Sequence, residues 1–240
     1  MVKKTAKRVL RKLKNWAGIN SASTKTVIPK YGIFSYAQEG EDLVLSRLFG
    51  QRNEGFYVDV GAHHPIRFSN TYKFYKDGWT GINIDAMPDS MRLFDEVRPN
   101  DINLEAAVSD KEESLVFHIF NEPALNTFSK EEASKKDGLR NYKIVEKKTI
   151  TTQTLNQILE KYLSPNQDID FLSIDVEGLD LQVLKSIDLS KYQPKCILIE
   201  ELKRYSVDEL LQNSDVYSYL KDRNYEFFAK TFNTLFFKYK

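Results

Sequence analysis

Segment 56–63 reads Phe56-Tyr57-Val58-Asp59-Val60-Gly61-Ala62-His63, an apolar run that ends in an acid and a glycine. A short apolar run bounded by turn signals is typical of a strand that is buried on both faces. Glycine at position 61 lets the backbone turn tightly and approach a ligand, because no Cβ stands in the way. The segment therefore predicts a buried strand followed by a binding loop.

Strand-like and helix-like segments alternate along the rest of the chain. The patterns predict strands over 55–60, 81–85, 102–108, 115–120, 169–175 and 195–200. They predict helices over 39–49, 70–76, 89–97, 154–162 and 178–187. This alternation indicates an α/β fold with a doubly wound, mostly parallel sheet and helices on both faces.

The C-terminus departs from the alternation. Two aromatic-rich runs, 225–229 and 235–239, are joined by the short polar segment 230–234, which predicts an antiparallel hairpin closing the sheet. The charged segment 129–148 is expected to form a mobile loop or a helix over the site.

Length and composition indicate one catalytic domain. A chain of 240 residues can bury one sizeable core. The single cysteine, Cys196, lies in an apolar run, so no disulfide framework is expected and a reducing cytoplasm fits. No stretch has the ~18 apolar residues that a membrane span needs, which favours a soluble protein.

The basic residues gather at the N-terminus. Residues 1–30 carry nine Lys or Arg and no acid, and the remaining chain has 26 basic and 34 acidic residues. Residues 1–17 have the spacing of a basic amphipathic helix, which fits peripheral contact with the inner face of a membrane. A solvated extension fits equally well. We place the domain at 31–240; its acidic balance argues against nucleic acid as a partner.

Acids end the first two predicted parallel strands. Asp59 and Asp85 lie 26 residues apart, which leaves room for one loop and one helix. A carboxylate in the position of Asp85 can accept both hydroxyls of a ribose, although each acid could instead be a turn or cap residue. Residues 62–65 lack the further glycines of a diphosphate-binding loop, so a nucleoside cofactor without phosphates fits better.

A second group of acids ends two later strands. Asp175, Glu177, Glu200 and Glu201 are expected at one edge of the sheet, where their charges require a proton, a metal or a cation. Magnesium, which prefers oxygen ligands, is one solution. The alternative is that Glu177 caps a helix and Glu200 meets a basic side chain.

His63 and His64 follow the glycine turn directly. Either can act as a general base, or both can be structural. The sequence has no zinc-site spacing, no serine-hydrolase elbow and no phosphate-binding loop of the P-loop type.

Six motifs in order resemble the FkbM-type methyltransferases over about residues 36–201. They are Tyr36-Ala37-Gln38-Glu39-Gly40-Glu41-Asp42, Tyr57-Val58-Asp59-Val60-Gly61-Ala62-His63, Ser69-Asn70-Thr71, Gly78-Trp79-Thr80-Gly81, Ala107-Val108-Ser109-Asp110 and Asp170-Phe171-Leu172-Ser173-Ile174-Asp175-Val176-Glu177-Gly178. The family often has Asn and Gly after Gly-Ala, where this chain has His63-His64-Pro65. The resemblance implies a class I methyltransferase fold, Rossmann-like, with seven strands of which the last is antiparallel.

The resemblance also implies S-adenosylmethionine as cofactor. Asp59 and Gly61 would lie beside its methionine part, Asp85 would bind the ribose, and Ala107-Val108 would flank the adenine. The other expected cofactor contacts lie in the matching motifs: Gln38, Ala62, Asn70 and Asp175. Asp175 and Glu177 would face the reacting centre. Related sugar methyltransferases that use magnesium favour Asp175, Glu200 and Glu201 as its ligands.

Family members methylate hydroxyl groups, often on sugars of bacterial polysaccharides or on specialised metabolites. We therefore expect an O-methyltransferase that acts on a sugar hydroxyl of a bacterial glycan, in polysaccharide biosynthesis, or of a glycosylated metabolite. The base that takes the hydroxyl proton is expected among Asp175, Glu177, His63 and His64. Two alternatives are a nucleotide-linked oxidoreductase or epimerase, and a noncatalytic scaffold on the same fold.

Overall fold

The strand predicted from segment 56–63 is β1, Phe56–Val60, and it is the third strand of a seven-stranded sheet. The computed structural model describes residues 31–240, and Ser35–Lys240 form one compact unit. The helix predicted for residues 1–17 lies outside the described residues. No described helix has the length and apolarity to cross a membrane.

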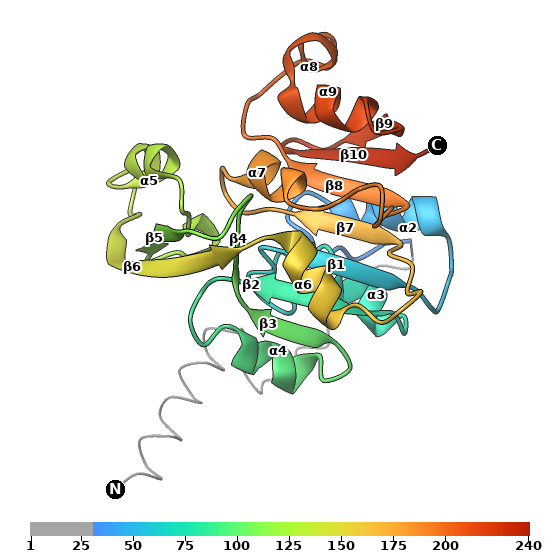
Figure 1. Ribbon diagram of the computed structural model, residues 1–240, viewed down its shortest axis with the longest axis horizontal. Coiled ribbons are helices and arrows are strands. Elements are labelled where there is room, and N and C mark those ends of the chain that lie inside the picture. Colours follow the sequence, from blue (N-terminus) through green and yellow to red (C-terminus); the bar gives the residue numbers. More distant parts are fainter. Residues whose placement is uncertain (1–30) are drawn as a thin grey trace, which may run out of the picture. The chain divides into compact units, whose positions relative to one another are not determined.

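The sheet has the strand order β3-β2-β1-β7-β8-β10-β9 (Figure 1). The other strands are β2 (Thr80–Asp85), β3 (Ile102–Glu105), β7 (Phe171–Ile174), β8 (Cys196–Glu200), β9 (Tyr225–Lys230) and β10 (Thr234–Tyr239). Pairing is parallel from β3 to β8, and β10 runs antiparallel to both β8 and β9. The predicted fold class and the C-terminal hairpin are therefore confirmed.

Helices cover both faces because side chains along each strand alternate in direction. Tyr57 faces α2 (Glu41–Phe49) and α3 (Tyr72–Lys76) in an aromatic cluster that includes Trp79 and Phe171. Val58 and Val60 face the opposite, aliphatic cluster. Its helices are α6 (Leu155–Tyr162), α7 (Asp180–Lys185), α8 (Val207–Asn213) and α9 (Asp215–Lys221). These two apolar layers hold the strand ends rigidly in register.

A second, three-stranded sheet corrects two predictions. The predicted strand 102–108 is broken: β3 belongs to the large sheet, while β4 (Ala107–Val108) pairs with β6 (Ile144–Gln153). The predicted strand 115–120 is β5 (Ser114–Phe120), which pairs antiparallel with β6 and not with the main sheet. The chain therefore leaves the large sheet after Glu105 and builds a separate ribbon.

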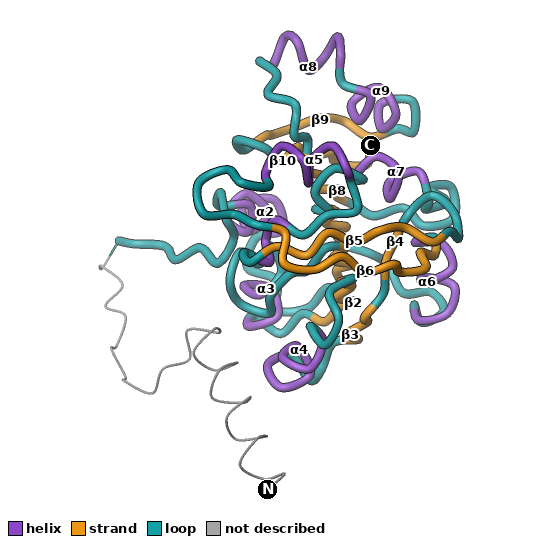
Figure 2. The backbone as a smooth tube through the Cα atoms, turned by 90° about the vertical axis from the view of Figure 1, so that its left-hand side faces the viewer, coloured by secondary structure: helices purple, strands orange, loops and turns teal. Residues whose placement is uncertain are grey.

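The ribbon carries the charged segment 129–148. Seven of its 20 residues form a helix, α5 (Lys130–Lys136), but its last residues belong to the strand β6 instead of a loop or a helix. Ser129 begins α5 by accepting a hydrogen bond from the Glu132 backbone N–H. Figure 2, viewed from the left of Figure 1, shows the ribbon and α5 on the near side of the large sheet. Two further elements are α4 (Met91–Val97) and the short 3-10 helix η1 (Pro123–Leu125).

Candidate active site

The loop after β1 turns across the end of β2. The backbone N–H groups of Gly61 and Ala62 both donate to the Ile84 carbonyl, at 2.9 and 3.0 Å. Gly61 has φ of 85°, and a Cβ built on it would lie 1.7 Å from the carbonyl oxygen of Asp175 at the end of β7. A side chain is excluded there by contact as well as by conformation. The sequence predicted that Gly61 lets the backbone approach a ligand closely. In the structure this glycine also lets β1 and β7 end side by side.

Asp85 ties the loops that follow the first two strands. Its carboxylate accepts the His63 backbone N–H at 2.8 Å and the Met87 backbone N–H at 2.7 Å. Burial raises the pKa of Asp85 against the effect of these two hydrogen bonds. Each carboxylate oxygen has a further lone pair, so the group can still accept a ligand hydroxyl.

Asp59 lies inside the protein, with 4% of its surface exposed. It accepts a hydrogen bond from Thr71 Oγ1 at 2.9 Å, and Thr71 in turn receives one from Arg98. Burial raises the pKa of Asp59, and Arg98 opposes that rise. The Asp59 side chain therefore stabilises the loop after β1 from inside the protein. The backbone of Gly61, not this side chain, would contact a ligand directly.

Arg98 is fully buried and holds the same loop at several points. Its guanidinium donates twice to the Pro65 carbonyl, at 2.9 and 2.6 Å, and once to Ser69 Oγ at 2.6 Å. It also lies 3.9 Å from the buried Asp101. Sequence patterns gave no sign of Arg98, because a basic residue at the end of a helix is normally solvated.

The remaining predicted cofactor residues border the same edge. Asn70 donates to Ser173 Oγ at 3.1 Å, which links the loop after β1 to β7. Ala107 and Val108 are buried. They follow Ala106, whose backbone N–H donates to the Asp85 carbonyl. Gln38 is exposed. Its segment is attached to the loop after β1, because the Ser69 backbone N–H donates to the Tyr36 carbonyl.

Three of the predicted acids meet at the carboxyl ends of β7 and β8. Carboxylate oxygens of Asp175, Glu177 and Glu200 lie within 4.8 Å of one another. Glu200 Oε2 is buried and has no hydrogen-bond partner among residues 31–240. Three hard oxygen ligands at this spacing can hold a divalent cation or surround another positive group.

Glu201 does not join the cluster. It accepts a hydrogen bond from Ser214 Oγ at 3.1 Å, and its backbone N–H donates to the Asn233 carbonyl at 2.8 Å. The predicted ligand set is therefore corrected: Glu177 replaces Glu201. Residues at adjacent positions after a strand point in opposite directions, which turns Glu201 away from Glu200.

The cluster is strongly acidic. Solvent reaches Asp175, yet the protein around its carboxyl group, followed by the charge of Glu177, holds the pKa well above its usual value. Burial and then Asp175 do the same for Glu200. Asp180 adds to the crowding; burial raises its pKa to about 7 although the Val176 and Gly178 backbone N–H groups bind it. The site has an excess of negative charge to neutralise.

Lys136 supplies one positive charge from the ribbon. It forms an ion pair with Glu177, and among residues 31–240 it is the one basic residue paired with the cluster. Thr127 Oγ1 also donates to the Glu177 carbonyl at 2.6 Å. Lys136 was not singled out from the sequence, because nothing in a charged segment marks the one lysine that folds back.

The two histidines differ in their surroundings. His64 Nδ1 accepts the Ile66 and Arg67 backbone N–H groups at 3.0 and 2.9 Å, which gives it a structural role in the turn. His63 Nε2 is buried without a hydrogen-bond partner among the described residues. Burial lowers the pKa of each to about 4, so both are neutral at pH 7. His63 is therefore the one of the two with a free lone pair for catalysis.

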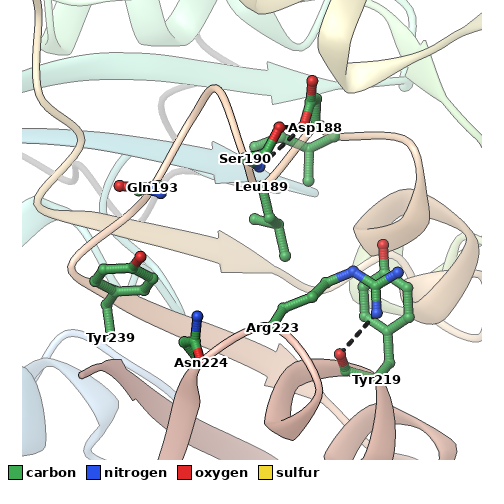
Figure 3. Close-up of a pocket in the computed structure, with 9 residues that line it drawn as sticks. Asp188, Leu189, Ser190, Gln193, Tyr219, Arg223, Asn224 and Tyr239 are labelled. Atoms are coloured by element: carbon green, nitrogen blue, oxygen red, sulfur yellow. Dashed lines mark hydrogen bonds between the residues drawn. The ribbon is translucent and has the colours of Figure 1, made fainter.

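A cavity of about 360 Å³ lies at the other edge of the sheet (Figure 3). Its lining includes Asp188 and Gln193, which precede β8, Arg223, which precedes β9, and Tyr239, the last residue of β10. The Tyr239 backbone N–H donates to the Lys195 carbonyl, at the amino end of β8. Because ligands of parallel sheets bind at the carboxyl ends, this cavity is separate from the candidate active site.

Comparison with known proteins agrees with the resemblance in the motifs. Residues 59–227 match the sequence family described as the methyltransferase FkbM domain. The chain is also similar to the crystal structure of methyltransferase FkbM from Methylobacillus flagellatus KT, with 12% identity and a TM-score of 0.47. That similarity covers 78% of this chain and 44% of the other, so this chain spans less than half of that protein. No curated protein matches the sequence.

Proposed function

This chain belongs to the methyltransferase FkbM domain family, and from that premise we propose that it transfers a methyl group from S-adenosylmethionine to a sugar hydroxyl. The family match supports a methyltransferase. The cofactor, the hydroxyl and the glycan substrate are the proposed parts, and the chemistry of the site supports them.

The observation that carries the proposal is the acidic cluster at the carboxyl ends of β7 and β8. Asp175, Glu177 and Glu200 have a single paired base, Lys136, so the site favours a positively charged ligand. S-adenosylmethionine has a sulfonium and an ammonium group. A dinucleotide has a diphosphate, which these acids would repel, and that disfavours the oxidoreductase alternative.

The residues present fit the cofactor's parts in order across the sheet. The backbone of Gly61 and Ala62 and the carboxylate of Asp175 would border the methionine part. Asp85 would accept the ribose hydroxyls, with Ala107 and Val108 beside the adenine. When bound, the cofactor supplies a methyl group on a positively charged sulfur, which makes it open to attack by an oxygen nucleophile.

Asp175 is the base that the surroundings favour. Its pKa is raised by the surrounding protein and by Glu177, which brings its basicity closer to what a hydroxyl proton requires. Glu177 is engaged by Lys136, and His63 has a pKa of about 4, which makes it a weaker base. The chain's further contribution is to position the hydroxyl, since a near-attack geometry supplies much of the rate enhancement.

Magnesium remains a prediction for this cluster, with Asp175, Glu177 and Glu200 as the ligands. Dialysis against EDTA tests it: a metal-dependent enzyme loses methyl transfer and regains it when Mg²⁺ is restored. Unchanged transfer after dialysis would leave protons and the bound cofactor as the charges that neutralise the acids.

The proposal is tested by transfer of a radiolabelled methyl group from S-adenosylmethionine to bacterial polysaccharide. Wild-type protein is expected to label the polysaccharide at base-stable ether positions, and Asp175→Asn to lose most of that activity while still binding S-adenosylhomocysteine. Glu112→Gln is the matched control, because Glu112 is an exposed acid that forms no ion pair among residues 31–240. Cofactor binding without transfer to any glycan would support the scaffold alternative instead.

A further inference from the structure

An unpaired arginine and an exposed aromatic ring lie in the loop after β8 and in the turn between β9 and β10. The guanidinium carbon of Arg204 is 4.6 Å from the ring centroid of Phe232, and 60% of the Phe232 surface is exposed. Within residues 31–240, Arg204 forms no ion pair and none of its N–H groups donates to another residue. The pair thus presents an apolar ring face and a free set of donors to solvent.

The register of the sheet places the two loops that carry this pair at the carboxyl end of β8, where Glu200 lies. Glu200, a member of the cluster, pairs with Thr234 across β8 and β10, and Glu201 donates to the Asn233 carbonyl. Arg204 follows Glu200 by four residues, so their Cα atoms are at most about 14 Å apart even if the chain is extended. A substrate in contact with Asp175 is therefore within reach of the pair.

Hydrogen bonds hold both loops in place. Thr231 and Thr234 close the hairpin turn through a 2.9 Å backbone bond, and the Asn233 N–H donates to Glu39 Oε2 at 2.9 Å. On the other side, Lys230 Nζ donates to the Tyr205 carbonyl at 3.0 Å, which links the hairpin to the loop of Arg204. A preorganised pair loses little entropy when a ligand binds.

Two other arginine–aromatic pairs within the described part of the chain do not offer the same chemistry at this edge. Arg67 lies over Phe68 near His63, but its charge is taken up by Glu122 at 2.9 Å. Arg223 lies over Tyr219, 3.6 Å from the ring centroid, but at the opposite edge of the sheet in the cavity of Figure 3. Among the arginines of residues 31–240, Arg204 combines an exposed ring, an unpaired charge and a position four residues after Glu200.

We propose that Arg204 and Phe232 form a recognition site for an anionic sugar, a uronate or a phosphorylated sugar, in the glycan that the enzyme methylates. This rests on the proposed function. The ring of Phe232 packs against a sugar face, and the guanidinium of Arg204 binds the carboxylate or phosphate in a bidentate manner. Because the acidic cluster repels the anion, the charged group lies on Arg204 and a neutral hydroxyl is directed toward Asp175.

Three probes with the same ring separate the contributions: methyl β-D-glucoside, methyl β-D-glucuronide and methyl β-D-glucoside 6-phosphate. Their binding is measured by ligand-observed NMR with S-adenosylhomocysteine present. Wild-type protein is expected to bind at least one charged probe about tenfold more tightly than the glucoside, the gain typical of a charge-assisted hydrogen bond. Whichever charged probe binds more tightly identifies the anion as carboxylate or phosphate.

Variants assign the effect to residues. Arg204→Gln is expected to reduce the affinity for the charged probe to that for the glucoside. Phe232→Ala is expected to lower the affinity for every probe that binds. Arg223→Gln is the matched control and leaves binding unchanged, because its arginine–tyrosine pair lies at the other edge. Thermal unfolding confirms that each variant is folded.

The proposal is overturned if no probe binds, if the glucoside binds as tightly as the charged probes, or if Arg204→Gln keeps the preference. The proposed function is judged separately by calorimetry with S-adenosylhomocysteine. Cofactor binding without a preference for charged sugars refutes the recognition site alone, whereas absence of cofactor binding refutes the proposed function.

Discussion

Replacing Gly61 with alanine tests how β1 and β7 meet at the candidate active site. Gly61 has φ of 85°, and its added Cβ would lie 1.7 Å from the Asp175 carbonyl oxygen. That oxygen belongs to the backbone at the end of β7, so no flexible side chain can move aside. The two strand ends must separate, and Asp175 moves with them.

The expected cost has two parts. A non-glycine residue in the left-handed region costs roughly 1–2 kcal/mol. Forcing a methyl group into a filled site costs roughly 1–3 kcal/mol more. The free energy of unfolding should therefore fall by roughly 2–5 kcal/mol, which corresponds to a decrease in Tm of roughly 4–20 °C for a domain of this size.

Gly138 provides the matched control. It has φ of 84°, and a Cβ built on it meets no atom within 4 Å, so Gly138→Ala contains the backbone strain without the contact. Urea unfolding and calorimetry with S-adenosylhomocysteine are measured for both variants. Gly61→Ala should lose more stability than Gly138→Ala and should also lose cofactor affinity. Equal stability losses with unchanged affinity in Gly61→Ala would refute the steric argument.

Three further substitutions test other parts of the account. Arg98→Met removes the buried guanidinium that holds Pro65 and Ser69 and leaves acids unpaired, so urea unfolding should show a loss of about 3–5 kcal/mol. A loss below about 1 kcal/mol would contradict that role. Asp170 has a pKa below its usual value of 3.8, because hydrogen bonds from Lys195, the Phe56 backbone and Arg52 together outweigh the burial that raises it. The ionised carboxylate of Asp170 therefore stabilises the folded state above about pH 4, and this stabilisation is lost as the pH falls below that value. The difference in unfolding free energy between wild type and Asp170→Asn should shrink on acidification; a difference that does not change with pH would contradict a stabilising role of the carboxylate. Glu200→Gln removes one crowded charge and should raise the unfolding free energy by about 0.5–1 kcal/mol while weakening cofactor binding, and a loss of stability would show that its charge is already compensated.

Strands that are buried on both faces were predictable because their apolar runs are nearly continuous. β1, β7 and β8 fall within one or two residues of the ranges expected from the sequence. The C-terminal hairpin was equally clear, since two aromatic runs with a short polar connection have one simple solution. The convergence of Asp175 and Glu200 then followed from parallel neighbours ending at one edge.

The ribbon and the detailed contacts were beyond local patterns. Five of the ten residues of β6 are exposed and one is buried, so the strand lacks the apolar signal of a buried strand, and its charged start was assigned to a loop or a helix. The break between Glu105 and Ala107 depends on which sheet each strand joins, which is a tertiary choice. The choice of Glu177 over Glu201 likewise depends on side-chain direction after the strand ends.

The central claim is that the carboxyl edge of the sheet binds S-adenosylmethionine. A crystal structure of the protein with S-adenosylhomocysteine tests it most directly. We predict electron density across the carboxyl ends of β1, β2 and β7, with the ribose hydroxyls on Asp85 and the methionine part beside Gly61 and Asp175. Density in the cavity around Arg223 and Tyr239, at the opposite edge, would contradict the account.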